Sequence, residues 1–146
     1  MNIVESRSLD PMAPLDDLEP LLDLVGDARV VAIGESSHHV REFYLLRHRL
    51  LRFLVERRGF TVYALEAPFT DAHTIDAWVR GGPGTVEQVA SAGIDHGMGD
   101  CREMHDLLRW MREHERPMGT MPRAPNTSGS ISANPGAADL CGWSAA

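Results

Sequence analysis

The chain has 146 residues, the length of about one domain, and its 43% apolar and 24% charged residues are typical of a globular protein rather than a disordered or fibrous one. Its formal net charge of −7 argues against nucleic acid or an anionic membrane surface as the main partner. Apolar runs fall well short of the roughly 18 residues of a membrane span, and the N-terminus has no secretion-signal pattern. We therefore expect a cytoplasmic protein that binds neither nucleic acid nor membrane.

The first half of the chain predicts helices separated by two short strands. A short helix over residues 16–25 opens with two aspartates suited to cap it. Residues 29–34 and 61–65 are short, apolar, β-branched runs, each typical of a strand buried on both faces. Between them, residues 40–58 have helical periodicity and stop before Gly59.

Strand, long helix and strand in succession predict a βαβ unit. Such crossovers are right-handed and make the two strands parallel. The predicted fold class is therefore α/β with a parallel sheet. Because two strands leave unpaired edges, we expect the domain to be incomplete.

Three further helices are predicted downstream. The first begins near Thr70 and ends before Gly81. The other two open with the spacing of a capping box, Thr85–Gln88 and Asp100–Glu103.

The composition changes near residue 116. Residues 117–146 hold one basic residue and one acid, and they are rich in Pro, Gly, Ser and Ala without helical or strand periodicity. Such a segment buries too little apolar area to offset its chain entropy. We expect one α/β domain over residues 1–116, followed by a tail over 117–146 that is either disordered or translated out of frame.

Polar side chains follow both predicted strands. Glu35 and His38 come directly after the first strand, and Glu66 follows the second. In open parallel sheets ligands bind at the carboxyl ends of the strands, so these side chains can share one site. A His beside a carboxylate is suited to act as a general base, because the acid orients the ring and stabilises its protonated form.

One arginine of the long helix completes the predicted site. Arg47 falls on the apolar stripe of residues 40–58, where an unpaired charge is costly, so it is expected to clamp Glu35, Glu66 or a substrate oxygen. The helix places Arg41, Arg49 and Arg52 on the opposite face, where solvation is expected, and His48 is likewise expected on the surface.

Each candidate also has an ordinary structural interpretation. Glu35 can open a helix, His38 can be a loop histidine, Glu66 can cap the next segment, and Arg47 can form a structural ion pair. Their convergence on one predicted edge favours a functional site. His39 is a further candidate for substrate binding, although its direction is not determined by the spacing. Ligand spacing typical of a metal site is lacking, so we predict no cofactor, with a metal left possible.

Two segments, VVAIGESSHHVREFYLLRHRLLRFLVERRGF and TVYALEAPFTDAHTIDAWVRGG, together with DLLRWMREHE, resemble the N-terminal part of the erythromycin esterase family. The wider fold group also contains haem- and iron-binding proteins of the ChaN type. The resemblance implies a hydrolase that opens a macrolide lactone and so confers antibiotic resistance. It places the water-activating role on His38, with Glu35, Arg47 and Glu66 as polar partners. The family usually has Gly where this chain has His39.

Three functions remain open from the sequence. The first is an erythromycin esterase-like hydrolase acting on a small-molecule ester or macrolide lactone. The second is a metal- or haem-binding module of the ChaN type, for which Glu35, His38, His39 and Glu66 supply donors. The third is an inert fragment, since the family's proteins are several times longer than this chain.

Overall fold

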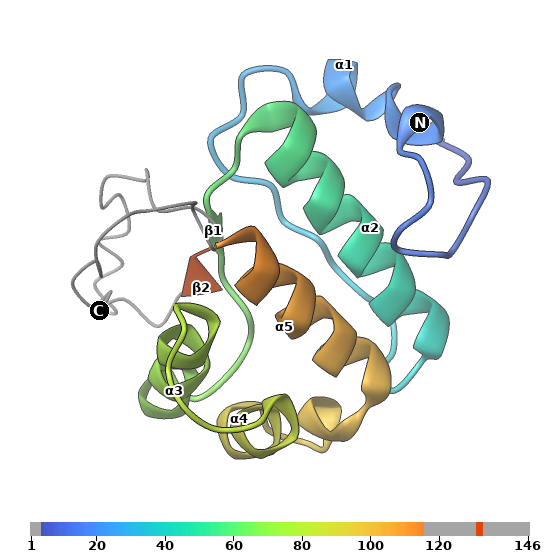
Figure 1. Cartoon of the computed structure of the whole chain (residues 1–146). Coiled ribbons are helices and arrows are strands. Elements are labelled where there is room, and N and C mark those ends of the chain that lie inside the picture. The colour runs from blue at the N-terminus through green and yellow to red at the C-terminus, as the bar shows by residue number, and fades with distance from the viewer. Residues whose placement is uncertain (1–3, 116–130, 133–146) are drawn as a thin grey trace, which may run out of the picture. The chain divides into compact units, whose positions relative to one another are not determined.

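The computed structural model describes residues 4–115 and 131–132 and divides the chain into two compact units, Met1–Phe60 and Thr61–Ala146 (Figure 1). The first unit contains the 3₁₀ turn η1 (Asp16–Leu18) and the helices α1 (Leu21–Val25) and α2 (Arg41–Arg58). The second contains β1 (Val62–Tyr63), α3 (Phe69–Val79), α4 (Val86–Gly93), η2 (Met98–Asp100), α5 (Arg102–His114) and β2 (Ile131–Ser132). Within the described residues, none of the helices is long and apolar enough to cross a membrane.

The first unit is built around α2. Phe53 and Leu54 of this helix form a buried cluster with Leu15 and Leu18 from the N-terminal segment. Partly buried apolar side chains extend the cluster: Leu21, Leu22, Val25, Val31, Ile33, Leu50 and Phe60. The helix ends at Gly59, whose φ of 69° suits glycine, so the predicted helix over residues 40–58 is confirmed.

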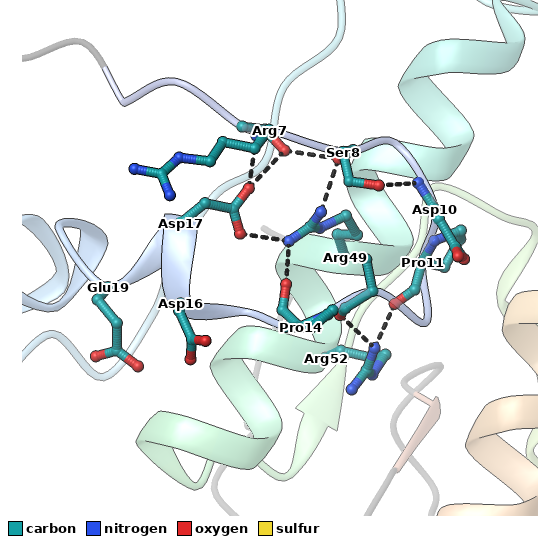
Figure 2. A network of polar contacts seen from close by, with 12 residues as sticks. Arg7, Ser8, Asp10, Pro11, Pro14, Asp16, Asp17, Glu19, Arg49 and Arg52 are labelled. Atoms are coloured by element: carbon teal, nitrogen blue, oxygen red, sulfur yellow. Dashed lines mark hydrogen bonds and ion pairs between the residues drawn. The ribbon is translucent and has the colours of Figure 1, made fainter.

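A second, polar set of contacts ties the N-terminal segment to α2 (Figure 2). Arg49 has no exposed surface. Its guanidinium is 2.5 Å from a carboxylate oxygen of Asp17 and donates to the backbone carbonyls of Ser8 and Pro14, both at 2.7 Å. The Asp17 carboxylate also accepts the backbone N–H of Arg7 at 2.6 Å. The buried charge is tolerated here because a carboxylate compensates it and both terminal nitrogens of the guanidinium donate hydrogen bonds.

Arg52 extends this arrangement along α2. It donates to the backbone carbonyl of Pro11 and pairs with Glu56 at 2.9 Å. The prediction that Arg49 and Arg52 are solvated is therefore wrong, because the N-terminal segment covers their face of the helix with carbonyl oxygens. His48 is also buried, at 3% exposed, against the prediction of a surface position.

In the second unit the helices α3, α4 and α5 pack against one another (Figure 1). The predicted capping box of α4 is confirmed, since Thr85 and Gln88 each accept a hydrogen bond from the other's backbone N–H. The predicted cap at Asp100 is wrong, because Cys101 is the N-cap of α5 and makes no side-chain cap bond. Helix α3 begins after Pro68 rather than at Thr70.

The parallel βαβ sheet predicted from the sequence is not what the structure shows. The predicted strand 61–65 is reduced to β1, which pairs with β2 in an antiparallel arrangement. Residues 29–34 form no strand, and Val30 is 83% exposed while Val31 and Ile33 pack against the core of the first unit. A short apolar run favours an extended backbone, but a strand also needs partners for its backbone groups.

The predicted tail lies almost entirely outside the described residues. Within 117–146, only Ile131–Ser132 are described, as the strand β2 that pairs with β1.

Candidate active site

Three of the predicted residues meet in the first unit. Oε1 of Glu35 lies 2.6 Å from Nδ1 of His38, and Oε2 of the same carboxylate is ion-paired with the Arg47 guanidinium. Glu35 therefore bridges an imidazole and a guanidinium, using one oxygen for each.

Local structure explains how Glu35 and Arg47 come to face each other. Val31 and Ile33 pack against the core that α2 builds, and in an extended chain every second side chain lies on the same side. Glu35 is the next residue in that alternation and so points toward α2. Arg47 lies on α2 itself, where it is 8% exposed.

The turn between Glu35 and α2 positions the histidine. His39 has a φ of 62°, in the left-handed region, and Val40 returns to extended backbone as the N-cap of α2. Residues 36–39 form the bend and turn that lead into α2, and within them Nδ1 of His38 reaches Oε1 of Glu35, three residues earlier in the chain.

The side chains of Arg47, Glu35 and His38 differ sharply in exposure. The side chains of Arg47 and Glu35 are 10% and 17% exposed, whereas that of His38 is 51% exposed. An ionised carboxylate can only accept hydrogen bonds, so Nδ1 of His38 must carry the proton that faces Glu35. In the neutral ring Nε2 then keeps its lone pair, which is the form a general base requires.

A buried tyrosine lies against the arginine of this site. The Cζ atom of Arg47 is 5.0 Å from the centroid of the Tyr44 ring, within the range of a cation–π interaction. Tyr44 is not among the site residues predicted from the sequence. Its signal was the spacing, because residues three apart on a helix lie on the same face.

Two further predicted residues lie outside this triad. Glu66 is exposed and follows β1 in the second unit, so its share in the site stays a prediction. The ring of His39 meets that of His38 edge-on, with centroids 6.4 Å apart, and its role in substrate binding also stays a prediction. In the part of the chain that the structure describes, no group of three or more His, Cys, Asp and Glu side chains is placed to hold a metal ion.

One family model and several known proteins are similar in sequence to this chain. Residues 55–124 match the family model described as erythromycin esterase. Two Escherichia coli proteins are similar: erythromycin esterase type II, 41% identical over 101 residues, and erythromycin esterase type I, 38% identical over 85 residues. The resemblance to the erythromycin esterase family is confirmed.

The similarity to the two erythromycin esterases covers only a small part of their length. The aligned residues make up 69% and 58% of this chain but only 23% and 20% of the type II and type I proteins. The chain thus spans less than a quarter of these relatives. The family match includes Glu66, and it extends beyond residue 116, where a boundary was predicted from composition.

Two solved structures share the fold. A Bacillus cereus protein of known crystal structure is 34% identical with a TM-score of 0.68, covering 75% of this chain and 26% of its own. A succinoglycan biosynthesis protein also gives a TM-score of 0.68, at 24% identity, covering 75% of this chain and 27% of its own. The latter likeness concerns the fold alone.

Replacing His39 with glycine is expected to stabilise the first unit by about 0.5–1 kcal/mol, because the left-handed backbone is strained for a residue with a Cβ and unstrained for glycine. His39→Ala keeps the Cβ and hence the strain, so it should give no such gain. Urea unfolding of the three proteins, followed by far-UV circular dichroism, measures the difference. Equal stability of the glycine and alanine variants would contradict the strain argument.

Proposed function

We propose that the chain carries the water-activating group of a carboxylic ester hydrolase of the erythromycin esterase type. The observation that supports this is the bridge at Glu35, which binds Nδ1 of His38 at 2.6 Å and pairs with Arg47 through its other oxygen. This arrangement leaves Nε2 of a half-exposed imidazole available to a water molecule.

In the proposed reaction His38 acts as general base. Its Nε2 accepts a proton from water as the water oxygen bonds to the ester carbonyl carbon. The bond between that carbon and the alkoxy oxygen then breaks, and the proton on Nε2 passes to the departing oxygen. The products are a carboxylic acid and an alcohol, and for a lactone the two remain on one opened chain.

The remaining residues support this step. Glu35 stabilises the imidazolium that forms at His38, as a carboxylate does for a catalytic histidine. Arg47 holds Glu35 in place and compensates its buried charge. We further propose that Glu66 contributes a polar group to the site and that the exposed ring of His39 contacts the substrate.

The proposed substrate class is the macrolide lactones. The support is the similarity to two proteins named as erythromycin esterases. Ring opening of such an antibiotic would make resistance the biological role.

The test is incubation of the purified chain with erythromycin and with simple aryl esters, analysed by mass spectrometry. We expect the lactone to gain the mass of one water, with heavy oxygen entering the new carboxyl group when the solvent is enriched in it. Absence of hydrolysis of every ester would refute the activity for this chain.

A further inference from the structure

Tyr44 is a buried aromatic residue that the proposed mechanism does not use. It lies on α2 three residues before Arg47, and it is 5% exposed. The Arg47 Cζ atom is 5.0 Å from the centroid of its ring. The guanidinium therefore has an aromatic face on one side and the Glu35 carboxylate as its ion-pair partner.

An arginine side chain has several rotatable bonds, so an ion pair alone does not define where its guanidinium lies. A flat aromatic surface restricts it further, because the electron-rich face attracts the cation. The low exposure of both side chains strengthens this attraction, since water competes little for the cation.

The position of Arg47 in turn decides how Glu35 is used. With Oε2 paired to Arg47, Oε1 is the oxygen that faces Nδ1 of His38. A guanidinium that moved away would leave the carboxylate free to rotate and to leave His38.

We propose that Tyr44 is a positioning residue for the histidine: through Arg47 and Glu35 it holds His38 in the form with the proton on Nδ1. The groups that face His38 are Glu35 and His39 from the turn, and the charge that faces Glu35 from α2 is Arg47. Only the kinetic part of this inference rests on the proposed function.

The first test compares Tyr44→Phe with Tyr44→Leu by proton–nitrogen NMR of the histidine rings at alkaline pH, where the imidazole is neutral. The His38 signals are identified by their loss in His38→Gln. We expect the native protein and Tyr44→Phe to show the proton on Nδ1. Tyr44→Leu should shift most of the population to the Nε2–H form, which is favoured in water.

A matched control separates positioning from packing. Phe53 is fully buried on the same helix, six residues beyond Arg47 in the apolar cluster with Leu15 and Leu18, and Phe53→Leu removes buried volume there. It should leave the proton on Nδ1 of His38. For the case in which Tyr44→Leu does not fold, a fluorinated phenylalanine at position 44 keeps the shape of the ring but makes its face electron-poor. That variant is expected to shift the proton as Tyr44→Leu does.

The second test measures kcat and KM with the ester that the native chain hydrolyses. Tyr44→Leu should lower kcat by about tenfold with little change in KM, the size expected for one cation–π contact, and Tyr44→Phe should retain kcat. Retention of the Nδ1 proton in the leucine or fluorinated variant would overturn the proposal even if the chain is an active esterase. A shifted proton in a chain without esterase activity would support the positioning role and refute the proposed function alone.

Discussion

Replacing Asp17 with alanine is expected to lower the free energy of unfolding of the first unit by about 3–5 kcal/mol, as the loss of one partner of a buried ion pair does. Arg49, which has no exposed surface, would keep its bonds to the Ser8 and Pro14 carbonyls but lose the only carboxylate that the described contacts give it. Hydrogen exchange of the α2 amides in urea measures the effect within the first unit.

The neighbouring aspartate supplies the control. Asp16 has a side chain that is 82% exposed and lies 3.5 Å from Arg57, so Asp16→Ala should cost about 0.5 kcal/mol or less. The double variant with Asp17→Ala and Arg49→Met should be more stable than Asp17→Ala alone, because it leaves no uncompensated buried charge. Similar losses at positions 16 and 17 would contradict the buried-pair interpretation.

Acid should weaken the same contact. Burial acts to raise the pKa of Asp17, but the backbone N–H of Arg7 and the charge of Arg49 outweigh it and hold the pKa below the ordinary 3.8. A lowered folded-state pKa stabilises the protein at pH values above 3.8, and this contribution is lost as the pH falls through the lowered value. Asp17→Ala should accordingly differ most from the native chain near neutral pH and least in strong acid.

Helices were the part of the fold that the sequence predicted well. The bounds of α2 follow from periodicity and from Gly59, and the start of α4 follows from Thr85 and Gln88, all of which act within a few residues. The burial of Arg49 and Arg52 on α2 by the N-terminal segment could not be predicted in this way. Periodicity shows which residues share a face, but the carbonyl oxygens that reach Arg49 and Arg52 come from a segment more than thirty residues earlier.

The strand predicted over residues 29–34 is absent, and the one predicted over 61–65 is shortened to Val62–Tyr63, for a related reason. Residues 29–34 have strand composition, yet a strand exists only where another segment pairs with its backbone, and composition does not name that partner. Val30, expected inside, is 83% exposed.

The candidate site likewise contains residues brought together by local structure and one residue whose place depends on distant segments. Glu35, His38 and Arg47 lie within thirteen residues of one another, so an alternating extended segment, one turn and one helix suffice to bring them together. Glu66 depends on the pairing of distant strands, which local patterns do not determine. Tyr44 was not singled out from the sequence, although its spacing of three residues from Arg47 on the helix was visible.

Replacing His38 with alanine is expected to lower kcat/KM for ester hydrolysis by roughly 10²–10⁴-fold, the usual contribution of a general base. Stability should change little, since the His38 side chain is 51% exposed and its loss opens no cavity in the core. Ser36→Ala is the matched control, because Ser36 is exposed in the same turn and should retain full activity. Initial rates at several substrate concentrations, with urea unfolding of each variant, provide both readouts.

The contact between Glu35 and His38 allows a more specific prediction. Glu35→Gln keeps the shape of the side chain but removes the charge that stabilises an imidazolium at His38, so it should also reduce kcat/KM. If the two residues act as one unit, the double variant will be no slower than His38→Ala alone, because Glu35 has nothing left to orient. Rate losses that multiply in the double variant would show that Glu35 acts independently of His38, and an active His38→Ala protein would exclude the general-base role.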